Sequence, residues 1–217
     1  MPALFYLIKG LMTNSPNLVF DHIAIVARNL DEGVDYVRQQ LGIEMPQGGA
    51  HPIMGTHNRL LSLGETEFLE VIAIDPDATS PKRPRWFGLD RFDGTPRIGA
   101  WLLGTSNITA SFDRAHGQII DMTRGDLKWQ ITVRDDGLLS YDGAFPQIIE
   151  WPQIAHPAGN MGKRGCRLKS FEISHPDALQ IQEFLAGSLQ DDRISISEGS
   201  HAFKAVIETP NGLRTLT

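Results

Sequence analysis

The chain carries one order of elements twice: a strand, a helix and three further strands. In the first copy, the apolar run 18–26 predicts a buried strand. Asn29 is suited to cap the helix that follows, and Gly42 is suited to end it. A Gly- and Pro-rich stretch with one short irregular strand then precedes two regular strands, over 57–63 and 67–74. A repeated unit constrains the fold more than any single motif does, because neither copy buries its apolar face alone.

The second copy is shorter and follows a connector, 75–96, which is rich in Pro, Arg and Asp. Its strands are predicted at 98–103, 127–133 and 145–151, and a short helix begins at Asn107. The two copies share almost no sequence identity. Their equivalence therefore rests on the order of elements alone.

Two alignments relate the copies. Matching the helix starts places Ala100 opposite His22, and matching the closing strands places Glu150 opposite Glu70. The two offsets agree closely, since 100 − 22 = 78 and 150 − 70 = 80. We therefore expect polar residues of one copy to meet polar residues of the other.

These elements divide the chain into four segments. Residues 1–17 form an apolar N-terminal lead-in, and residues 18–97 hold the first unit with its connector. Residues 98–157 hold the second, shorter βαβββ-like unit. Residues 158–217 show the order βαββ, so that the C-terminal segment looks like a further, shortened unit of the same kind.

Composition limits the partners of this chain. With 217 residues, 41% hydrophobic and 21% charged, the sequence is typical of a folded soluble protein. The net charge of −6 gives no concentrated basic face, so we expect neither a nucleic-acid nor a membrane partner. The apolar N-terminal run is too short to span a bilayer and lacks the pattern of a signal peptide. The single cysteine, Cys166, forms no intrachain disulfide, and we expect a cytoplasmic protein.

Two polar residues stand where the pattern of their strands asks for a hydrophobic side chain. His22 lies third in the run 20–26, and Glu70 lies third in the run 68–74. Burial of each group costs desolvation energy, and one divalent cation would compensate both if they share a face. The alternatives are a core histidine bonded to a backbone carbonyl and a strand face that is open to water. Glu150 raises the same question in the second copy.

The stretches around these residues resemble the vicinal oxygen chelate superfamily and, within it, the glyoxalase-like branch. The resemblance is carried by Asp21-His22-Ile23, His51-Pro52-Ile53-Met54-Gly55-Thr56-His57-Asn58, Leu60-Leu61-Ser62-Leu63-Gly64, Phe68-Leu69-Glu70-Val71-Ile72-Ala73, Pro146-Gln147-Ile148-Ile149-Glu150-Trp151 and His156-Pro157. It covers about 20–157 strongly and the C-terminal third weakly. It implies an α+β fold in which paired βαβββ units form a curved, partly open mixed β-barrel, with a C-terminal βαββ extension.

The resemblance also implies a divalent metal, held by the first and last strands of each unit. Matched residue by residue, the metal ligands are His22, Glu70 and Glu150. The fourth position falls on Ala100 or its neighbour Trp101, and neither side chain can bind a metal. One imidazole with two carboxylates suits Zn, Mn, Fe, Ni or Mg. Some members of the superfamily keep the fold and lose the metal.

A second group of candidates precedes and begins the strand at 57–63. We expect His57 and Asn58 to enter the cavity of the barrel, His57 as a catalytic base or substrate ligand, and His51 to reach it from a loop. The alternative is a turn in which Asn58 bonds the backbone. Their position at the edge of the expected site favours a role in the substrate pocket.

Tryptophans are the expected apolar walls of that pocket. Trp86, Trp101 and Trp151 are the candidates, and core packing is the stronger interpretation for Trp101. The sequence shows no glycine-rich phosphate loop, no dinucleotide-binding fingerprint and no Ser-His-Asp arrangement. The expected ligand is therefore a small molecule without a recognisable cofactor motif.

Three functions are compatible with the resemblance. The first is an enzyme whose metal chelates two neighbouring oxygens of a small substrate, with Glu70 or Glu150 as the catalytic proton-transfer group. Lyase, isomerase, hydrolytic and dioxygenase chemistry would all use that chelation. The second is a metal-free protein that sequesters a small molecule, and the third is a scaffold with a vestigial cavity. Fold alone does not name the substrate, and a homodimer is compatible with the sequence.

Overall fold

The computed structural model describes residues 17–151 and 156–217. The predicted N-terminal lead-in lies outside this part of the chain, apart from Asn17. Within the described residues are twelve strands, three α-helices and four short 3-10 helices. None of these helices is long and apolar enough to cross a membrane.

The elements follow the predicted repeat. The first unit consists of β1 (Val19–Val26), α1 (Leu30–Leu41), β2 (Gln47–His51), β3 (Thr56–Ser62) and β4 (Phe68–Ile74). The second consists of β5 (Arg97–Gly104), α2 (Ile108–Ser111), β6 (Gln118–Arg124), β7 (Leu127–Val133) and β8 (Gln147–Glu150). The C-terminal segment holds β9 (Arg167–Ser174), α3 (Ala178–Leu185), β10 (Ile194–Ser197), β11 (Ala202–Thr209) and β12 (Gly212–Leu216). The 3-10 helices are Trp86–Arg91, Arg114–His116, Ser140–Gly143 and Pro157–Asn160.

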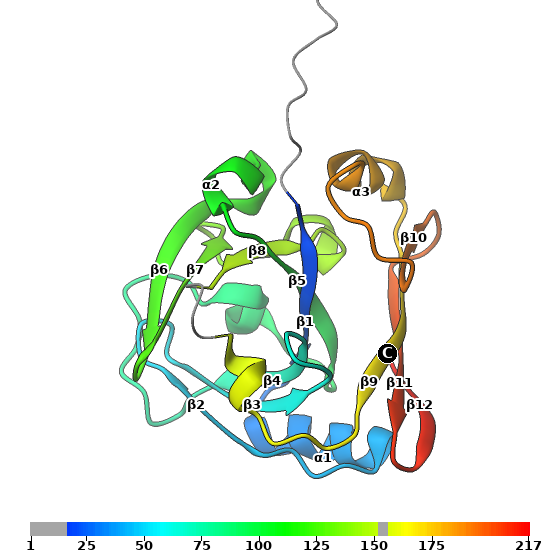
Figure 1. Cartoon of the computed structure of the whole chain (residues 1–217). Helices are drawn as coiled ribbons and strands as arrows, with labels where there is room; N and C mark the ends of the chain where they lie inside the picture. The colour runs from blue at the N-terminus through cyan, green and yellow to red at the C-terminus, as the bar shows by residue number, and fades with distance from the viewer. Residues whose placement is uncertain (1–16, 152–155) are drawn as a thin grey trace, which may run out of the picture.

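The two units share one eight-stranded sheet in the order β2-β3-β4-β1-β5-β8-β7-β6. β1 runs parallel to β4, β5 runs parallel to β8, and β1 and β5 pair antiparallel at the centre. The sheet curves into a nearly closed barrel, and its edge strands β2 and β6 face each other across one seam (Figure 1). The predicted α+β fold with a curved, partly open mixed β-barrel is thus confirmed.

The central pair of strands relates the units by an approximate two-fold axis. His22 lies opposite Leu102, and Ala24 lies opposite Ala100. Residues of β1 and β5 that are 78 positions apart are equivalent, since 100 − 22 and 102 − 24 are both 78. Under this equivalence His22 corresponds to Ala100 and Ala24 to Leu102, so each of the two pairings maps onto the other. This register agrees with the predicted alignment of His22 with Ala100.

The closing strands follow a different register from the predicted one. Glu70 in β4 lies opposite Ala24 in β1. The equivalent pairing in the second unit joins Leu102 in β5 to Gln147 in β8. Gln147, and not Glu150, is therefore the counterpart of Glu70.

Local signals fix the first helix as predicted. The Asn29 side chain accepts a hydrogen bond from the backbone N–H of Glu32 at 2.9 Å and caps α1. Gly42 ends the helix with φ +68°, a left-handed conformation that favours glycine. The Tyr36 hydroxyl donates to the carbonyl of Thr217 at 2.8 Å and ties α1 to the end of the chain.

The edge strands and the second helix differ from the prediction. β2 corresponds to the short irregular strand expected, without defined bounds, in the Gly- and Pro-rich stretch after the first helix, whereas the sequence pattern does not indicate β6. With β6 the second unit has all its strands, whereas its helix α2 spans only four residues. Edge strands bury little, so their sequences lack the apolar pattern that identifies central strands.

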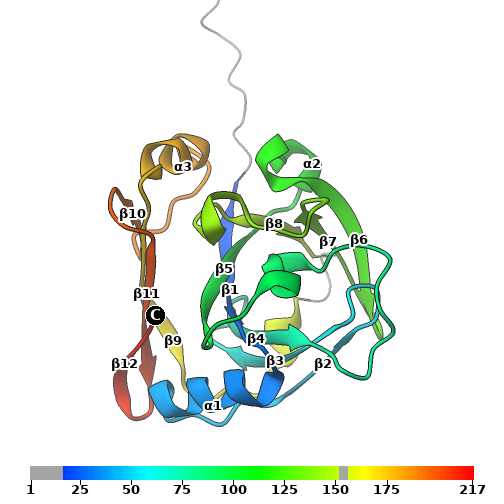
Figure 2. The same ribbon diagram turned by 180° about the vertical axis from the view of Figure 1, so that it is seen from behind.

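The C-terminal segment forms a separate four-stranded sheet in the order β10-β9-β11-β12, which stands beside the barrel (Figures 1 and 2). It packs on the outer face of the barrel, where Trp101 of β5 meets Phe171 of β9 with ring centroids 5.7 Å apart. The inner face of the barrel carries a second core, which includes Ala24, Ala100 and Leu102. The two faces of β1 therefore have different neighbours, and the site lies on the inner one.

Candidate functional site

A bulge in β1 directs two neighbouring polar side chains toward one another. The pairing with β5 steps from Phe20 opposite Leu103 to His22 opposite Leu102, so that Asp21 is an extra residue in β1. In a regular strand, neighbouring side chains point to opposite faces, whereas a bulge can turn both to one side. His22 lines the barrel cavity, and Asp21 bonds to its imidazole from behind.

Asp21 is a buried carboxylate that gathers three N–H donors. His22 donates through Nδ1 at 2.6 Å, Trp151 through Nε1 at 2.9 Å and His156 through Nε2 at 3.2 Å. Burial acts to raise the pKa of Asp21, but the hydrogen bonds from His156 and His22 outweigh it, so that this pKa is lowered. The carboxylate is therefore charged at neutral pH and holds His22 in one orientation.

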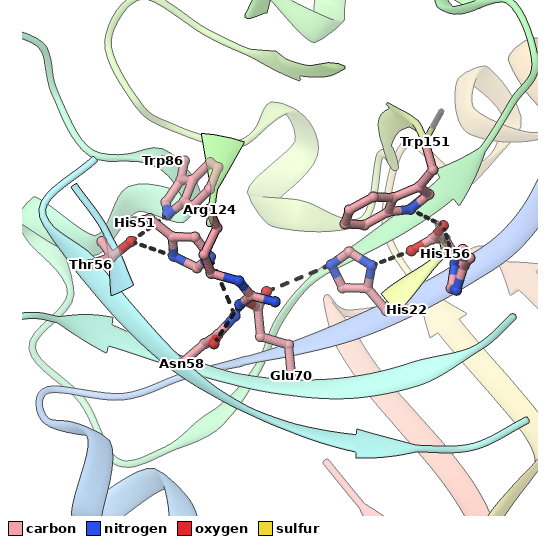
Figure 3. A network of polar contacts seen from close by, with 10 residues as sticks. His22, His51, Thr56, Asn58, Glu70, Trp86, Arg124, Trp151 and His156 are labelled. Atoms are coloured by element: carbon pink, nitrogen blue, oxygen red, sulfur yellow. Dashed lines mark hydrogen bonds and ion pairs between the residues drawn. The ribbon is translucent and has the colours of Figure 1, made fainter. Parts of the chain in front are cut away.

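His22 lies between two carboxylates. Its Nε2 faces Glu70 Oε2 at 3.6 Å (Figure 3). Its ring stacks on Phe68 with centroids 4.2 Å apart. Burial acts to lower the pKa of His22, but Asp21 and then Glu70 raise it to about 9. At neutral pH the ring is an imidazolium that offers Nε2–H to the cavity.

Asn58 positions the second carboxylate. Its Nδ2 donates to Glu70 Oε1 at 2.6 Å and lies 3.4 Å from His51 Nε2. Burial acts to raise the pKa of Glu70, but the contact with His22 and the Asn58 hydrogen bond lower it below its usual value. Glu70 is thus an ionised base with one oxygen fixed and the other directed at His22.

His51 is a neutral histidine on the same wall. Its Nδ1 bonds Thr56 Oγ1 at 3.1 Å, and Trp86 Nε1 donates to the same hydroxyl at 3.2 Å. Its Nε2 accepts from Asn58, so Nδ1 carries the proton. Burial lowers the pKa of His51 to about 4, which keeps the ring uncharged at neutral pH. The two cavity histidines therefore differ in charge.

Arg124 adds a cation from the other unit. It lies at the end of β6, and its Nη1 reaches across the seam to donate to Asn58 Oδ1 at 3.0 Å (Figure 3). The backbone N–H of Gly49 donates to the same oxygen at 2.9 Å. Burial lowers the pKa of Arg124, and the charge of Glu70 counteracts this, so the guanidinium stays protonated.

Around these groups is a narrow cavity of about 30 Å³, enough for the reacting end of a molecule rather than for all of it. Its polar wall comes mainly from the first unit, and both units contribute to its apolar wall. The lining residues are His22, His51, Asn58, Leu60, Phe68, Glu70, Trp86, Phe87, Arg124, Trp129, Ile131, Ile149, Trp151 and Pro157. The structure therefore brings together six of the predicted site residues: His22, Glu70, His51, Asn58, Trp86 and Trp151.

Glu150 does not join them. Ile149 lines the cavity, so its neighbour Glu150 points to the opposite face of β8, where it lies opposite Gln130. There Glu150 Oε2 accepts the backbone N–H of Ile108 at 2.7 Å, at the start of α2. The prediction that Glu150 converges with His22 and Glu70 is wrong, because it placed Glu150 on the wrong face of its strand.

His57 and Trp101 also lie outside the cavity. In β3, Asn58 takes the inward position, and His57 turns outward, with Nδ1 4.0 Å from Asp75 Oδ1. Trp101 is fully buried in the outer core and donates through Nε1 to the carbonyl of Ala144 at 2.9 Å. Trp101 therefore packs in the core, and the expectation that His57 enters the cavity is not met.

The side chains present do not fit the metal site that the resemblance implies. His22 and Glu70 offer one donor each, but the counterpart of His22 is Ala100, and the counterpart of Glu70 is the amide Gln147. Across 17–151 and 156–217, no three His, Cys, Asp or Glu side chains are grouped so as to hold a metal ion. A protein metal site normally takes three or four such ligands. At the two matched positions, the second unit thus supplies no imidazole, thiolate or carboxylate ligand.

Three residues of the site were not assigned a role from the sequence. Asp21 was noticed only beside His22, because strand alternation places it on the other face and a bulge leaves no clear sequence signal. Arg124 precedes Gly125 in the turn between β6 and β7, where a basic residue is usually exposed. Trp129 alternates with polar residues in β7, and this pattern alone does not distinguish the inner face from the outer one.

Paired βαβββ units around a polar cavity define the class of vicinal oxygen chelate proteins. A family model described as "Glyoxalase-like domain" matches residues 20–189. The chain therefore belongs to the glyoxalase-like domain family. Among curated proteins, no sequence matches this chain.

Solved structures share the fold at low sequence identity. A hypothetical protein from Staphylococcus aureus is 15% identical, with a TM-score of 0.59 over 88% of this chain and 91% of that one. Methylmalonyl-CoA epimerase from Mycobacterium tuberculosis is 18% identical, with a TM-score of 0.42 over 66% of this chain and 93% of that one. The similarity to the Staphylococcus aureus protein shows the fold and leaves the reaction to be argued from the site.

Proposed function

We propose that the protein is an enzyme that moves a proton on a small organic molecule held in this cavity, without a bound metal. The observation that carries the proposal is the buried series Asp21, His22 and Glu70, with contacts of 2.6 and 3.6 Å. Its environment separates two roles, since His22 is held protonated and Glu70 is held ionised. An acid and a base with shifted pKa values beside a cavity are typical of proton-transfer sites.

The gap between His22 Nε2 and Glu70 Oε2 is the proposed place of reaction. At 3.6 Å it is too long for a hydrogen bond, so a substrate that inserts there breaks no short contact. A carbonyl oxygen beside Nε2–H and an adjacent C–H beside Oε2 would be set for enolisation. Glu70 takes the proton from carbon, and His22 gives its proton to oxygen as the enol forms.

The cycle closes with both groups restored. Glu70 returns its proton to the same carbon or to a neighbouring one, and His22 recovers its proton from the enol oxygen. Return to the same carbon epimerises the substrate, and return to another carbon isomerises it. Either outcome conserves atoms and electrons without a further reactant.

Asp21 is a positioning residue in this proposal. Its bond to Nδ1 fixes the imidazole ring and raises the pKa of His22. Trp151 and His156 hold Asp21 in turn, so the carboxylate has no freedom to rotate toward the cavity. A fixed carboxylate behind a histidine is the usual means of holding its orientation in acid–base catalysis.

The expected metal-dependent chelation is not part of this proposal, because Ala100 and the amide Gln147 stand where the second unit would need an imidazole and a carboxylate. The charged imidazolium takes over the task of stabilising an enolate-like intermediate. The second candidate function, a metal-free protein that sequesters small molecules, is favoured by one observation. The cavity is narrow and mostly apolar, which suits tight binding as well as reaction.

Deuterium exchange tests the proposal. Protein treated with a chelator is incubated in D₂O with small 2-oxo acids, 3-oxo esters and aldehydes, and ¹H NMR follows the loss of each α C–H signal. We expect exchange on one class of compound, abolished in His22→Asn and retained in His57→Asn, whose side chain lies outside the cavity.

Two results would contradict the proposal. The first is exchange that occurs only after a divalent ion is added. The second is equal exchange in both histidine variants. Binding of the same compounds by calorimetry with no exchange would instead support the sequestering function.

A further inference from the structure

Arg124 is the charged group of the cavity that the proposed reaction does not use. Among the described residues it makes one side-chain hydrogen bond, to Asn58, and no ion pair with an acid. A guanidinium carries five N–H donors, so most of them are not used by the protein. A partly buried cation with unused donors is costly unless something else pairs with it.

Asn58 keeps Arg124 and Glu70 apart. Its amide nitrogen donates to Glu70 Oε1 at 2.6 Å, while its carbonyl oxygen accepts from Arg124 Nη1 at 3.0 Å. Without this side chain, the carboxylate and the guanidinium would be free to pair with each other. The arrangement therefore preserves an unpaired cation on one side of the cavity and a free base on the other.

The backbone of β2 is shaped to admit the arginine. A Cβ atom at Gly49 would lie 2.8 Å from Arg124 Cδ, closer than real Cβ contacts. Any other residue at position 49 would push the arginine stem away from the seam. Gly49 thus supports the crossing of Arg124 from β6 to Asn58 independently of the hydrogen bond.

We infer that Arg124 binds a carboxylate of the substrate, whose flat apolar body lies against the tryptophans. This rests on the proposed function for the place of the reacting atoms but not for binding itself. One guanidinium matches the charge and the two-oxygen fork of a carboxylate, whereas a phosphate dianion normally takes more donors. Trp86, Trp129 and Trp151 supply the apolar walls.

Matched probes test the inference without turnover. Benzoate, phenylacetate and cinnamate are compared with their neutral amides by calorimetry on the full chain. We expect at least one carboxylate to bind more tightly than its amide, and Arg124→Gln to weaken that carboxylate by roughly tenfold to a hundredfold. Arg124→Lys keeps the charge but loses the fork, so it should fall between the two.

Controls separate binding from folding. Arg59→Gln removes an arginine from the same sheet, next to Asn58 but on the opposite face of β3, and should leave the affinity unchanged. Amide affinity should be equal in wild type and Arg124→Gln, which a misfolded variant would not show. If Arg124→Gln fails to fold, the Arg124→Lys measurement decides.

Each outcome bears on one proposal at a time. Failure of all three carboxylates to bind at millimolar concentration, or equal affinity in the arginine variants, would overturn the inference. Loss of carboxylate binding in Arg124→Gln without any proton exchange would keep the anion site and remove the proposed reaction. If Arg124→Gln exchanges the protons of neutral compounds as fast as wild type exchanges those of carboxylates, the proposed reaction would stand and the anion site would be removed.

Discussion

The two halves of the barrel have the same fold and unequal chemistry. The first unit supplies Asp21, His22 and Glu70, whereas the two-fold axis places Ala100 and Gln147 at the corresponding positions of the second. A metal on that axis would need ligands from both halves. A duplicated fold can thus concentrate its reactive groups in one copy and leave the other to shape the pocket.

The second half contributes the environment of those groups. Trp129, Ile131, Ile149 and Trp151 line the cavity, and Arg124 reaches it from the edge strand. Apolar walls exclude water and strengthen the charge interactions of the first half. The halves are therefore complementary, and substitutions at matched positions should have very different effects.

The largest contrast is expected between two glutamates. Glu70→Gln removes the proposed base and should lower the exchange rate by about 10²- to 10⁴-fold. Glu150→Gln changes a residue on the outer face of β8 and should leave the rate within about twofold. Rates from the deuterium assay measure both. A large loss in Glu150→Gln with little loss in Glu70→Gln would return the chemistry to the second half.

Stability should show the same asymmetry. His22→Leu leaves Asp21 and Glu70 buried without their shared cation and should lower the free energy of unfolding by about 3–5 kcal/mol. Gln147→Leu removes one contact to Thr132, at 3.3 Å, from an amide whose Nε2 has no partner among the described residues. Its cost should be about 1 kcal/mol or less. Urea unfolding of both variants measures the difference, and equal costs would contradict it.

The pH dependence of stability isolates His22. Its folded pKa of about 9 lies above the ordinary 6.5, so its stabilisation is complete below pH 6.5 and is lost as the pH rises through about 9. The shift corresponds to about 3 kcal/mol as an upper value. Urea unfolding between pH 6.5 and 9.5 should show this loss in wild type and not in His22→Leu. A flat wild-type profile would mean that the imidazolium is not held by its neighbours.

His51 should give the opposite sign. Its folded pKa of about 4 lies below the ordinary 6.5, so the unfolded chain takes up the proton first. Stability should therefore fall as the pH drops from 6.5 toward 4. A His51→Gln variant should lose part of this acid sensitivity. The two histidines of one cavity would then limit stability from opposite ends of the pH range.

The sequence predicted the central part of the fold, but it gave the edge strand β2 no defined bounds and missed the edge strand β6. β1, β4 and α1 carry dense apolar patterns and a clear cap, and these follow directly from burial and local hydrogen bonding. β2 has the sequence Gln-Gly-Gly-Ala-His and β6 is half polar, because an edge strand packs on one side only. Their pairing comes from the closure of the barrel, which no local pattern encodes.

The sequence predicted those site residues that interrupt an apolar strand with a polar side chain, which are His22 and Glu70. It missed residues whose place in the site depends on which face of a strand they occupy. The predicted alignment matched Glu70 to a residue 80 positions later, whereas the true counterpart, Gln147, lies 77 positions later. The difference of three residues is odd, so Glu150 lies on the opposite face of β8 from the one predicted. Asp21 depends on a bulge, which adds one residue to the count without any signal in composition.

Metal addition should have the smallest effect of all. With ligands in one half only, the protein should carry less than one equivalent of divalent metal after purification, and chelator treatment should change neither the unfolding midpoint nor the exchange rate. Elemental analysis and urea unfolding with and without Zn²⁺, Mn²⁺ or Fe²⁺ measure this. Stoichiometric metal that is lost in both His22→Leu and Glu70→Gln would show that two side chains and solvent suffice to hold it. In that case the bound ion, instead of the imidazolium of His22, would supply the positive charge that stabilises an enolate.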